Sequence, residues 1–167
     1  GKTWSKNTEH LFAHPFGGSQ DPCMLQLRDG TILCSSYGWT LLNSDVAAKI
    51  KNGKKHQGII RQGTFVFLGG YILRSTDGGK TWQGPIIPPP IPGNAMSDMF
   101  GDPIPAWNRG AMCEASDGQL YWAVRSDKRL QPRLSSTHLM VSSDKGETWE
   151  YRCPIAEDET ISFDETS

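Results

Sequence analysis

An eight-residue pattern, Ser-x-Asp-x-Gly-x-Thr-Trp, occurs twice in this 167-residue chain and constrains its fold more than any other feature. We call it the box. One copy is 75–82, the second is 142–149, and the opening Gly1-Lys2-Thr3-Trp4 matches the second half of the same pattern. Aligned on their glycines, the copies are 79 − 1 = 78 and 146 − 79 = 67 residues apart. Intervals of this size indicate a repeated supersecondary unit.

The residue types of the box favour a hydrogen-bonded turn that ends in a buried anchor. Ser, Asp and Thr side chains can bond nearby backbone groups, and glycine permits unusual φ values. Burial of an indole contributes about 5 kcal/mol, an upper estimate. We therefore interpret the box residues as structural: Ser75, Asp77, Gly79, Thr81, Trp82, Ser142, Asp144, Gly146, Thr148 and Trp149.

Each complete box follows an Asp-Gly dipeptide flanked by β-prone residues, at Asp29-Gly30 and Asp117-Gly118. Such dipeptides predict two-residue hairpins with a type I′ turn, in which both central residues have positive φ. Each repeat therefore contains a strand, the Asp-Gly hairpin, a strand, a loop, a strand, the box and a last strand. We expect the third strands at 65–75 and 138–142, and one short helix within 43–53.

Composition and charge narrow the possible functions. The 18 Gly, 11 Pro and 6 Trp, with little helical periodicity, favour an all-β fold. A net charge of −1 gives no general attraction to nucleic acid. No apolar run approaches the roughly 18 residues that a membrane span needs. The 4 cysteines form no C-x-x-C pair, so we expect no metal site and no cofactor.

The two complete boxes resemble the Asp-box (BNR) repeat of the sialidase superfamily, whose members are six-bladed β-propellers. The resemblance implies that this chain forms about two to three blades of such a propeller. Residues 1–12 would be the outer strand of a preceding blade, and 13–90 a blade with the box at 75–82. Residues 91–157 would be a blade with the box at 142–149, and 158–167 the start of the next blade.

The resemblance also implies a function. It suggests an exported protein, whether secreted, periplasmic or on the cell surface. That protein would be a retaining exo-sialidase-like hydrolase with a tyrosine nucleophile, acting on terminal sialic acid-type sugars of glycoconjugates. The alternative is a non-catalytic propeller that binds glycans or proteins. Several family motifs are not recognisable in these residues, so we expect no turnover from the chain alone. We expect the remaining blades of a longer protein, or self-association, to cover its exposed sheet faces.

Strand parity predicts where a site would lie. Both kinds of hairpin fall at one end of each blade, and the long segments 5–20, 38–64, 84–108 and 126–137 fall at the other end, where binding residues tend to sit. The first strand of each blade should line the central channel. Counting back eight residues from Asp29 and Asp117 gives 29 − 8 = 21 and 117 − 8 = 109. Asp21 and Arg109 are therefore candidate substrate-binding residues.

Both candidates have structural alternatives. Asp21 precedes Pro22, a residue that restricts the backbone ahead of it, so Asp21 could simply turn the chain. Arg109 could pair with a neighbouring acid. In the segment 126–137 and just before it, Arg125, Arg129 and Arg133 could bind an anionic glycan or form a solvated basic loop. Tyr37, Trp39 and Trp107 could stack on a sugar or pack in the core.

Glu165 is the candidate catalytic residue by resemblance, because sialidase-like proteins place a glutamate shortly after a box. That glutamate activates the tyrosine nucleophile. A tyrosine suits this chemistry because the carboxylate of the sugar would repel a carboxylate nucleophile. Asp164 is the fallback for the same role, and the structural alternative for Glu165 is a solvated loop carboxylate.

Overall fold

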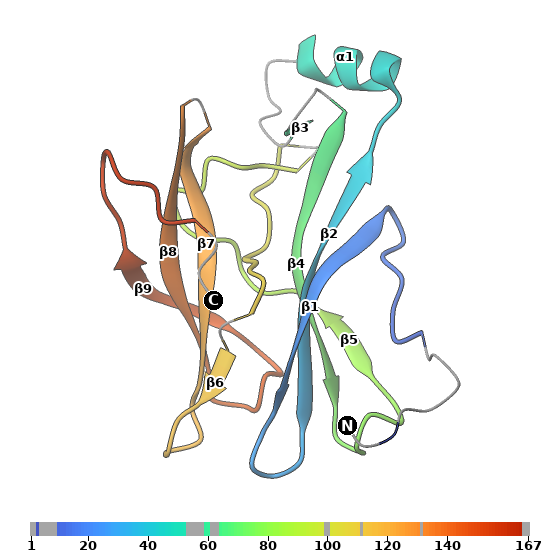
Figure 1. Ribbon diagram of the computed structural model, residues 1–167, viewed down its shortest axis with the longest axis vertical. Coiled ribbons are helices and arrows are strands. Elements are labelled where there is room, and N and C mark those ends of the chain that lie inside the picture. The colour runs from blue at the N-terminus through green and yellow to red at the C-terminus, as the bar shows by residue number, and fades with distance from the viewer. Residues whose placement is uncertain are drawn as a thin grey trace.

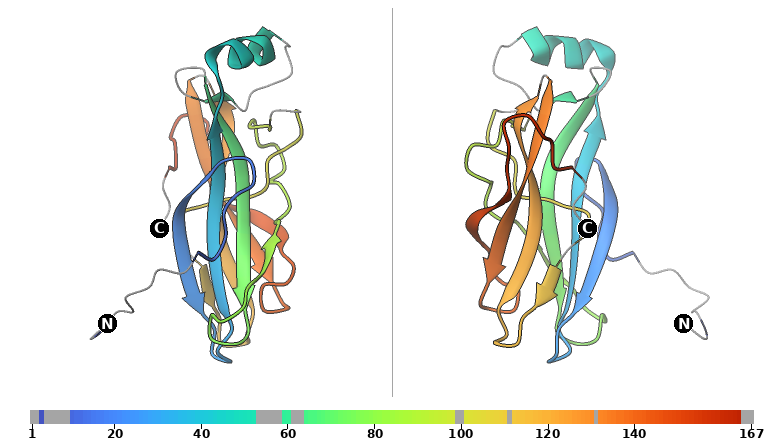
Figure 2. Two further views of the ribbon diagram at one scale, coloured as in Figure 1. Left: turned by 90° about the vertical axis from the view of Figure 1, so that its right-hand side faces the viewer. Right: turned by 60° about the vertical axis from the view of Figure 1, so that its left-hand side comes forward.

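The computed structural model folds into two antiparallel β-sheets that pack face to face, with a short helix at one end (Figure 1, Figure 2). It describes Thr3 and residues 10–52, 59–60, 64–98, 101–110, 112–130 and 132–164. These residues form nine strands and one helix. The all-β prediction is therefore confirmed.

The first sheet is built around three long strands in the order β1 (Gly18–Gln26), β2 (Ile32–Leu41) and β4 (Phe65–Ser75). Two short strands share the free edge of β4. Its first residues pair with β3 (Ile59–Ile60) and its last residues pair with β5 (Gln83–Ile86). The predicted third strand over 65–75 is confirmed with the same bounds.

The second sheet contains β6 (Met112–Glu114), β7 (Leu120–Leu130), β8 (Arg133–Ser142) and β9 (Glu150–Ala156), in that order. The prediction of a loop over 126–137, with a third strand only from residue 138, is wrong. The two long strands stay paired as far as Leu130 and Arg133. No alternation of apolar residues marks the strands in this region, because many of its buried residues are polar. They are Ser126, Asp127, Ser135, Ser136 and Thr137.

The Asp-Gly turns are hairpins, but the predicted type I′ geometry is wrong. Among the described residues, positive φ outside glycine occurs at Asp21 and Lys145, so neither turn aspartate has it. Gly30 has a φ of 93°, its N–H donates to Leu27 O, and Leu27 N–H donates to Thr31 O. This is a three-residue loop with glycine in the left-handed position. The turn around Gly118 repeats the same bonds.

The two complete boxes form matching hydrogen-bonded turns. In the first box, Ser75 Oγ accepts from Gly79 N–H at 2.9 Å, and Asp77 accepts from the Thr81 backbone N–H at 2.9 Å and from its hydroxyl at 2.6 Å. The second box repeats these three bonds at 2.9, 2.9 and 2.5 Å. The carboxylate thus satisfies donors at the centre of each turn, as the residue types suggested.

The core between the sheets is formed by side chains from the two sheet faces that point toward each other. Leu33 and Ile72 of the first sheet pack with Trp122, Met140 and Trp149 of the second. Trp149, the last residue of the second box, is 5% exposed and contacts the Trp122 ring edge-on, with centroids 5.6 Å apart. The second box is therefore an inter-sheet anchor as well as a turn.

Ionic contacts reinforce this packing at the box end. Lys145 Nζ lies 2.7 Å from the Asp29 carboxylate, and Arg74 Nη2 lies 3.1 Å from the Glu147 carboxylate. Arg74 Nε also donates to Lys145 O. The second box is thereby attached to the Asp-Gly turn and to β4 of the neighbouring sheet.

The far face of the first sheet carries a smaller cluster. Strand alternation places Cys34, Tyr71 and Leu73 on this face, with Phe12 and Trp82 packed against them. Trp82 is the first-box counterpart of Trp149, but it is only partly buried. The same box position is thus covered by a sheet in one copy and partly open in the other.

The ends of the sheets differ in the way that strand parity predicts. The Asp-Gly turns and the boxes lie at one end, whereas α1 (Ser44–Asn52) and the β7–β8 turn lie at the other (Figure 1). The predicted helix is confirmed, with Asn43 Oδ1 accepting from Asp45 N–H at 3.0 Å. Within the described residues, no helix is long and apolar enough to span a membrane.

We predict that Trp149→Ala lowers the free energy of unfolding by about 3–5 kcal/mol, because it opens a large cavity between the sheets. Trp82→Ala is the matched control. It should cost only about 1–2 kcal/mol, since its indole buries less apolar area. Urea unfolding at concentrations where sedimentation shows a monomer measures both. Equal losses of unfolding free energy in the two variants would contradict the conclusion that Trp149 is buried more completely than Trp82.

A second prediction concerns acid stability. The Thr81 hydroxyl and backbone N–H, followed by the Ser75 hydroxyl among the other donors, hold the pKa of Asp77 at about 2, below its ordinary value of 3.8. Since the folded pKa is the lower one, the stabilisation is fully present above pH 3.8 and is lost as pH falls toward about 2. Asp77→Asn should therefore flatten the dependence of unfolding free energy on pH in this window. Urea titrations at several pH values test it, with the exposed Glu150→Gln as the control.

Candidate functional site

The candidate site lies about midway along the two sheets, between the box end and the end that carries α1. Asp21 lies in the first half of β1, and Arg109 lies shortly before β6. They occupy equivalent positions in the two sheets, and the structure brings them together. Arg109 Nε is 3.0 Å from Asp21 Oδ2, with 42% and 38% of the respective side chains exposed. Arg109 therefore pairs with a neighbouring acid, which was the structural alternative to substrate binding.

Asp21 is held in an unusual backbone conformation. Its φ is 50°, and the register of β1 on β2 shifts between Gln20 and Cys23, which marks a bulge. A left-handed conformation costs roughly 1–2 kcal/mol for most residues, and Asp tolerates it better than most. Bulges re-aim side chains at the edges of sheets. Here the bulge coincides with the residue whose carboxylate reaches from β1 to the other sheet.

Tyr37 of β2 completes a three-residue group with this ion pair. Its hydroxyl donates to Asp21 Oδ2 at 2.6 Å, the same oxygen that faces Arg109. Burial, followed by the hydrogen bond to the Asp21 carboxylate, raises the pKa of Tyr37 to about 12, while Arg109 acts in the opposite sense. Tyr37 is therefore a neutral hydrogen-bond donor at ordinary pH. Sequence reasoning proposed only stacking or packing for its ring and missed its contact with Asp21.

The aromatic residues near this group belong to a buried cluster of Tyr37, Phe67, Met96, Ile104 and Trp107. The Tyr37 ring lies 5.0 Å from the Trp107 ring, and Phe67 lies 4.5 Å from Trp107. Tyr37 and Trp107 are 3% and 5% exposed. Packing in the core thus describes both residues, and their faces are not open for a sugar.

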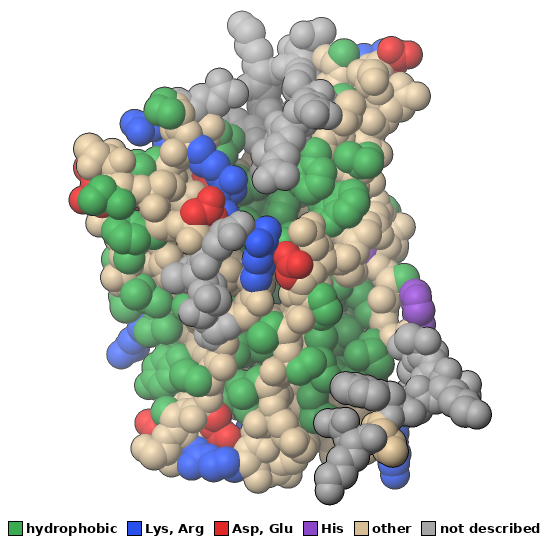
Figure 3. Space-filling view, in the orientation of Figure 1, with side chains coloured by type: hydrophobic (Ala, Val, Ile, Leu, Met, Phe, Trp, Pro, Cys, Tyr) green, Lys and Arg blue, Asp and Glu red, His purple; other side chains and the backbone are tan. Residues whose placement is uncertain are grey.

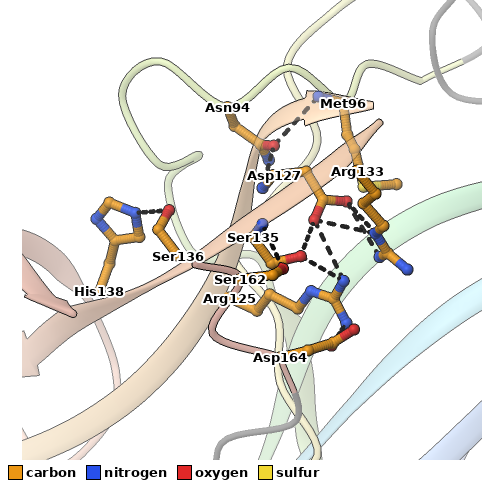
Figure 4. Close-up of polar contacts among 10 residues, drawn as sticks. All are labelled: Asn94, Met96, Arg125, Asp127, Arg133, Ser135, Ser136, His138, Ser162 and Asp164. Carbon is orange, nitrogen blue, oxygen red and sulfur yellow. Dashed lines mark hydrogen bonds and ion pairs between the residues drawn. The ribbon is translucent and has the colours of Figure 1, made fainter. Parts of the chain in front are cut away.

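A second polar group lies next to this cluster and centres on two buried, charged residues of β7 (Figure 4). Arg125 and Asp127 are 5% and 1% exposed. Arg125 Nη2 lies 3.2 Å from Asp127 Oδ1, and its guanidinium carbon lies 5.3 Å from the centre of the Trp107 ring. Such a buried pair is stable only when hydrogen bonds satisfy its remaining groups.

The expected basic loop at 126–137 is corrected, because 126–130 and 133–137 are paired strands, in which Arg129 and Arg133 stay exposed. Arg133 donates to both Asp127 oxygens, at 3.1–3.2 Å. Lys128 is paired with Glu157 at 2.5 Å and Glu159 at 3.0 Å, and Arg129 donates to Pro132 O. These cations are committed to partners within the chain. The buried Asp127, which pairs with both Arg133 and Arg125, had no recognisable signal in the sequence.

Glu165 lies outside the described residues, so the structure does not place the candidate catalytic carboxylate. Its fallback, Asp164, is described and forms an ion pair with Arg125. Basic and acidic side chains lie side by side near the middle of the molecular face that Figure 3 shows. No group of three or more metal-ligating side chains occurs among the residues that the structure covers.

A cavity of about 370 Å³ lies apart from both polar groups. Its lining is mostly apolar and includes Phe12, Phe16, Tyr71, Pro85 and Ile87. It is open on the same face of the first sheet that carries Trp82 and Cys34. Because its walls are apolar and belong to an exposed sheet face, we assign it to packing rather than to the candidate site.

We predict that Asp21→Asn lowers the pKa of Tyr37 from about 12, because the mutation removes the carboxylate that favours the neutral phenol. The remaining effect of burial should still keep it above its ordinary value of 10.0. NMR titration of tyrosine ring carbons measures the change. The Tyr71 resonance is the internal control, since its hydroxyl bonds Ser19 instead. An unchanged Tyr37 titration would rule out coupling to Asp21.

No protein-family model matches the chain, and no curated protein matches it. Among solved structures, it is similar to a crystal structure of a protein of unknown function from Dyadobacter fermentans DSM 18053. The identity is 50% and the TM-score 0.87, over 98% of this chain and 43% of that one. It is also similar to the Hadza microbial sialidase Hz136, with 23% identity and a TM-score of 0.52, over 83% of this chain and 24% of that one. The chain spans less than half the length of either protein, and its likeness to the sialidase is one of fold alone.

Proposed function

We propose that the two sheets are neighbouring blades of a sialidase-like β-propeller that hydrolyses terminal sialic acid-type sugars. Asp21 and Arg109 would lie at the sugar site, on the side opposite the boxes. The observation that carries this proposal is that equivalent positions of two successive sheets meet there, at 3.0 Å. Residues from successive blades converge in this way when inner strands surround a common channel. The same proposal includes export of the protein, so that it acts on glycans outside the cell.

The proposed chemistry divides between residues of this chain and the rest of a longer protein. Glu165 would activate a tyrosine nucleophile that lies elsewhere in that protein. Arg109 would bind the sugar directly, because a guanidinium matches a carboxylate with two parallel hydrogen bonds. Asp21 would orient Arg109, and the neutral Tyr37 hydroxyl would hold Asp21.

The packing of the box tryptophans supports the proposal that more protein covers this chain. Trp149 is buried because the face that carries it meets the other sheet, at Leu33 and Ile72. Trp82 occupies the same box position on a face with no covering sheet among the described residues. We propose that a further blade of a longer protein covers the Trp82 face, and that self-association is the alternative.

A non-catalytic glycan-binding module is the second candidate, and one observation favours it. Asp21 already neutralises Arg109, while Asp127 and Asp164 face the buried Arg125. Arginines that are paired in this way attract an anionic sugar less strongly than arginines without acidic partners. An ion pair at the surface would instead offer a donor and an acceptor side by side to the hydroxyl groups of a neutral sugar.

The test uses a protein that contains this chain in full and a fluorogenic sialoside. Glu165→Gln should lower kcat about 100- to 10,000-fold, because it removes an acid–base group while keeping the size of the side chain. Glu159→Gln is the matched control, since this carboxylate is 86% exposed and pairs with Lys128. Its kcat should be unchanged.

Arg109→Met separates the two candidate functions. In a sialidase it should raise KM for the sialoside, because it removes a contact to the substrate carboxylate. If the parent protein hydrolyses no sialoside but binds neutral glycans, and both Arg109→Met and Asp21→Asn weaken that binding, the second candidate is correct. Retained kcat in Glu165→Gln would exclude the catalytic role of Glu165.

A further inference from the structure

The buried Arg125 side chain is fixed on several sides. The backbone N–H of Arg125 donates to Trp107 O at 3.0 Å, and its guanidinium lies over the Trp107 ring. Its Nη2 donates to Ser135 Oγ at 2.8 Å and to Asp127 Oδ1 at 3.2 Å. An arginine enclosed in this way has little freedom to reorient toward a ligand.

Asp127 is the shared acceptor of this group. Besides Arg125 and Arg133, its Oδ1 accepts from Ser135 Oγ at 2.6 Å, and its backbone N–H donates to Asn94 Oδ1 at 3.2 Å. The Asp127 side chain has no exposed surface. One carboxylate therefore faces two guanidinium groups, so a second anion beside Arg125 would balance the charge.

Asp164 supplies that second anion and comes from a different segment. Its carboxylate pairs with Arg125 Nη1, on the side of the guanidinium away from the contact with Asp127 (Figure 4). Among the described residues, two arginines and two aspartates thus alternate in one connected group. We call Arg125, Asp127, Arg133, Ser135 and Asp164 the Arg125 clamp.

Ser135 connects the clamp to the backbone that leads to Asp164. Its N–H donates to Ser162 Oγ at 2.9 Å, and its carbonyl accepts from Phe163 N–H at 2.9 Å. The same residue uses its hydroxyl within the clamp. The position of Ser135 on β8 therefore sets the position of 162–164, although these residues belong to no strand.

We propose that the Arg125 clamp is a positioning device for the segment 162–164, and through it for the next residue in the sequence, Glu165. This inference rests on the proposed function, in which Glu165 activates the nucleophile. Arg125 and Asp164 are then positioning residues: they do not touch the sugar. The clamp fixes the chain from β7 and β8 of the preceding sheet, so a rigid sheet sets the last backbone positions before a catalytic group.

The first experiment measures the segment itself, by amide hydrogen exchange in a protein that contains the full chain. Arg125→Lys and Asp164→Asn should each speed exchange of the Phe163 amide by about tenfold or more, because the segment opens more often. The double variant should be no faster than the singles, since both remove the same contact. Ser162→Ala leaves the buried charges intact and serves if the first two variants fold poorly. Arg129→Lys, an exposed change in the same hairpin, should leave exchange unchanged.

The second experiment measures kinetics on the same variants. Arg125→Lys and Asp164→Asn should lower kcat by roughly 10- to 100-fold with KM nearly unchanged, because a small displacement of a catalytic group has effects of this size. Ser162→Ala should have the same direction and a smaller effect. Exchange of β7 and β8 amides near Trp122 and Met140 must stay slow, which separates loss of positioning from unfolding.

The outcomes are distinguishable. A rise in KM with unchanged kcat would overturn the proposal, because Arg125 would then contact the substrate. Unchanged Phe163 exchange in all three variants would overturn the clamp itself. Fast Phe163 exchange with unchanged kcat would show that the clamp holds the segment but does not position a catalytic group. If the wild-type protein hydrolyses no sialoside, the proposed function and its catalytic extension fail, and exchange alone still decides whether the clamp fixes 162–164.

Discussion

The contact between the second box and the first sheet is the interaction on which the architecture depends. Trp149 completes a turn within its own sheet and fills the space between the sheets. Gly146, in the same turn, packs so closely on Leu33 that a Cβ atom would come within 2.8 Å of that side chain. A local hydrogen-bonded turn therefore fixes the distance between two sheets. The same sequence pattern can therefore close a hairpin and also pack one repeat against the next.

Away from the boxes, two groups of charged residues connect distant segments of the chain. Asp21 with Arg109, and Asp127 and Asp164 with Arg125, join segments that are far apart in the sequence. The first pair is partly exposed and connects two sheets, so it is accessible to a ligand. The second group is largely buried, so its arginine is committed to holding the chain. Exposure, more than residue type, separates a candidate binding group from a positioning group.

Much of the fold could be predicted from the sequence, because the signals were local. The box pattern, the Asp-Gly turns and the capped helix each depend on residues within a few positions of one another. The type I′ turn geometry was wrong because the dipeptide fixes a glycine at positive φ without fixing the loop length. The part of the β7–β8 hairpin within 126–137 was missed because most of its buried residues are polar, so no apolar alternation marks it. Counting within the repeat selected Asp21 and Arg109 as candidates, but it could not predict their contact with each other, because that contact joins two sheets.

By itself, the sequence determined an all-β chain with two equivalent turns and the end of the molecule at which long segments gather. It did so because hydrogen bonds within a turn and the alternation of a strand are set by neighbouring residues. The tertiary structure decided which charges meet. It paired Arg109 with Asp21, enclosed Arg125 between Asp127 and Asp164, and buried Trp149 more completely than Trp82. These differences arise from packing between distant segments, since burial and partner geometry determine whether an arginine or an indole is exposed or enclosed.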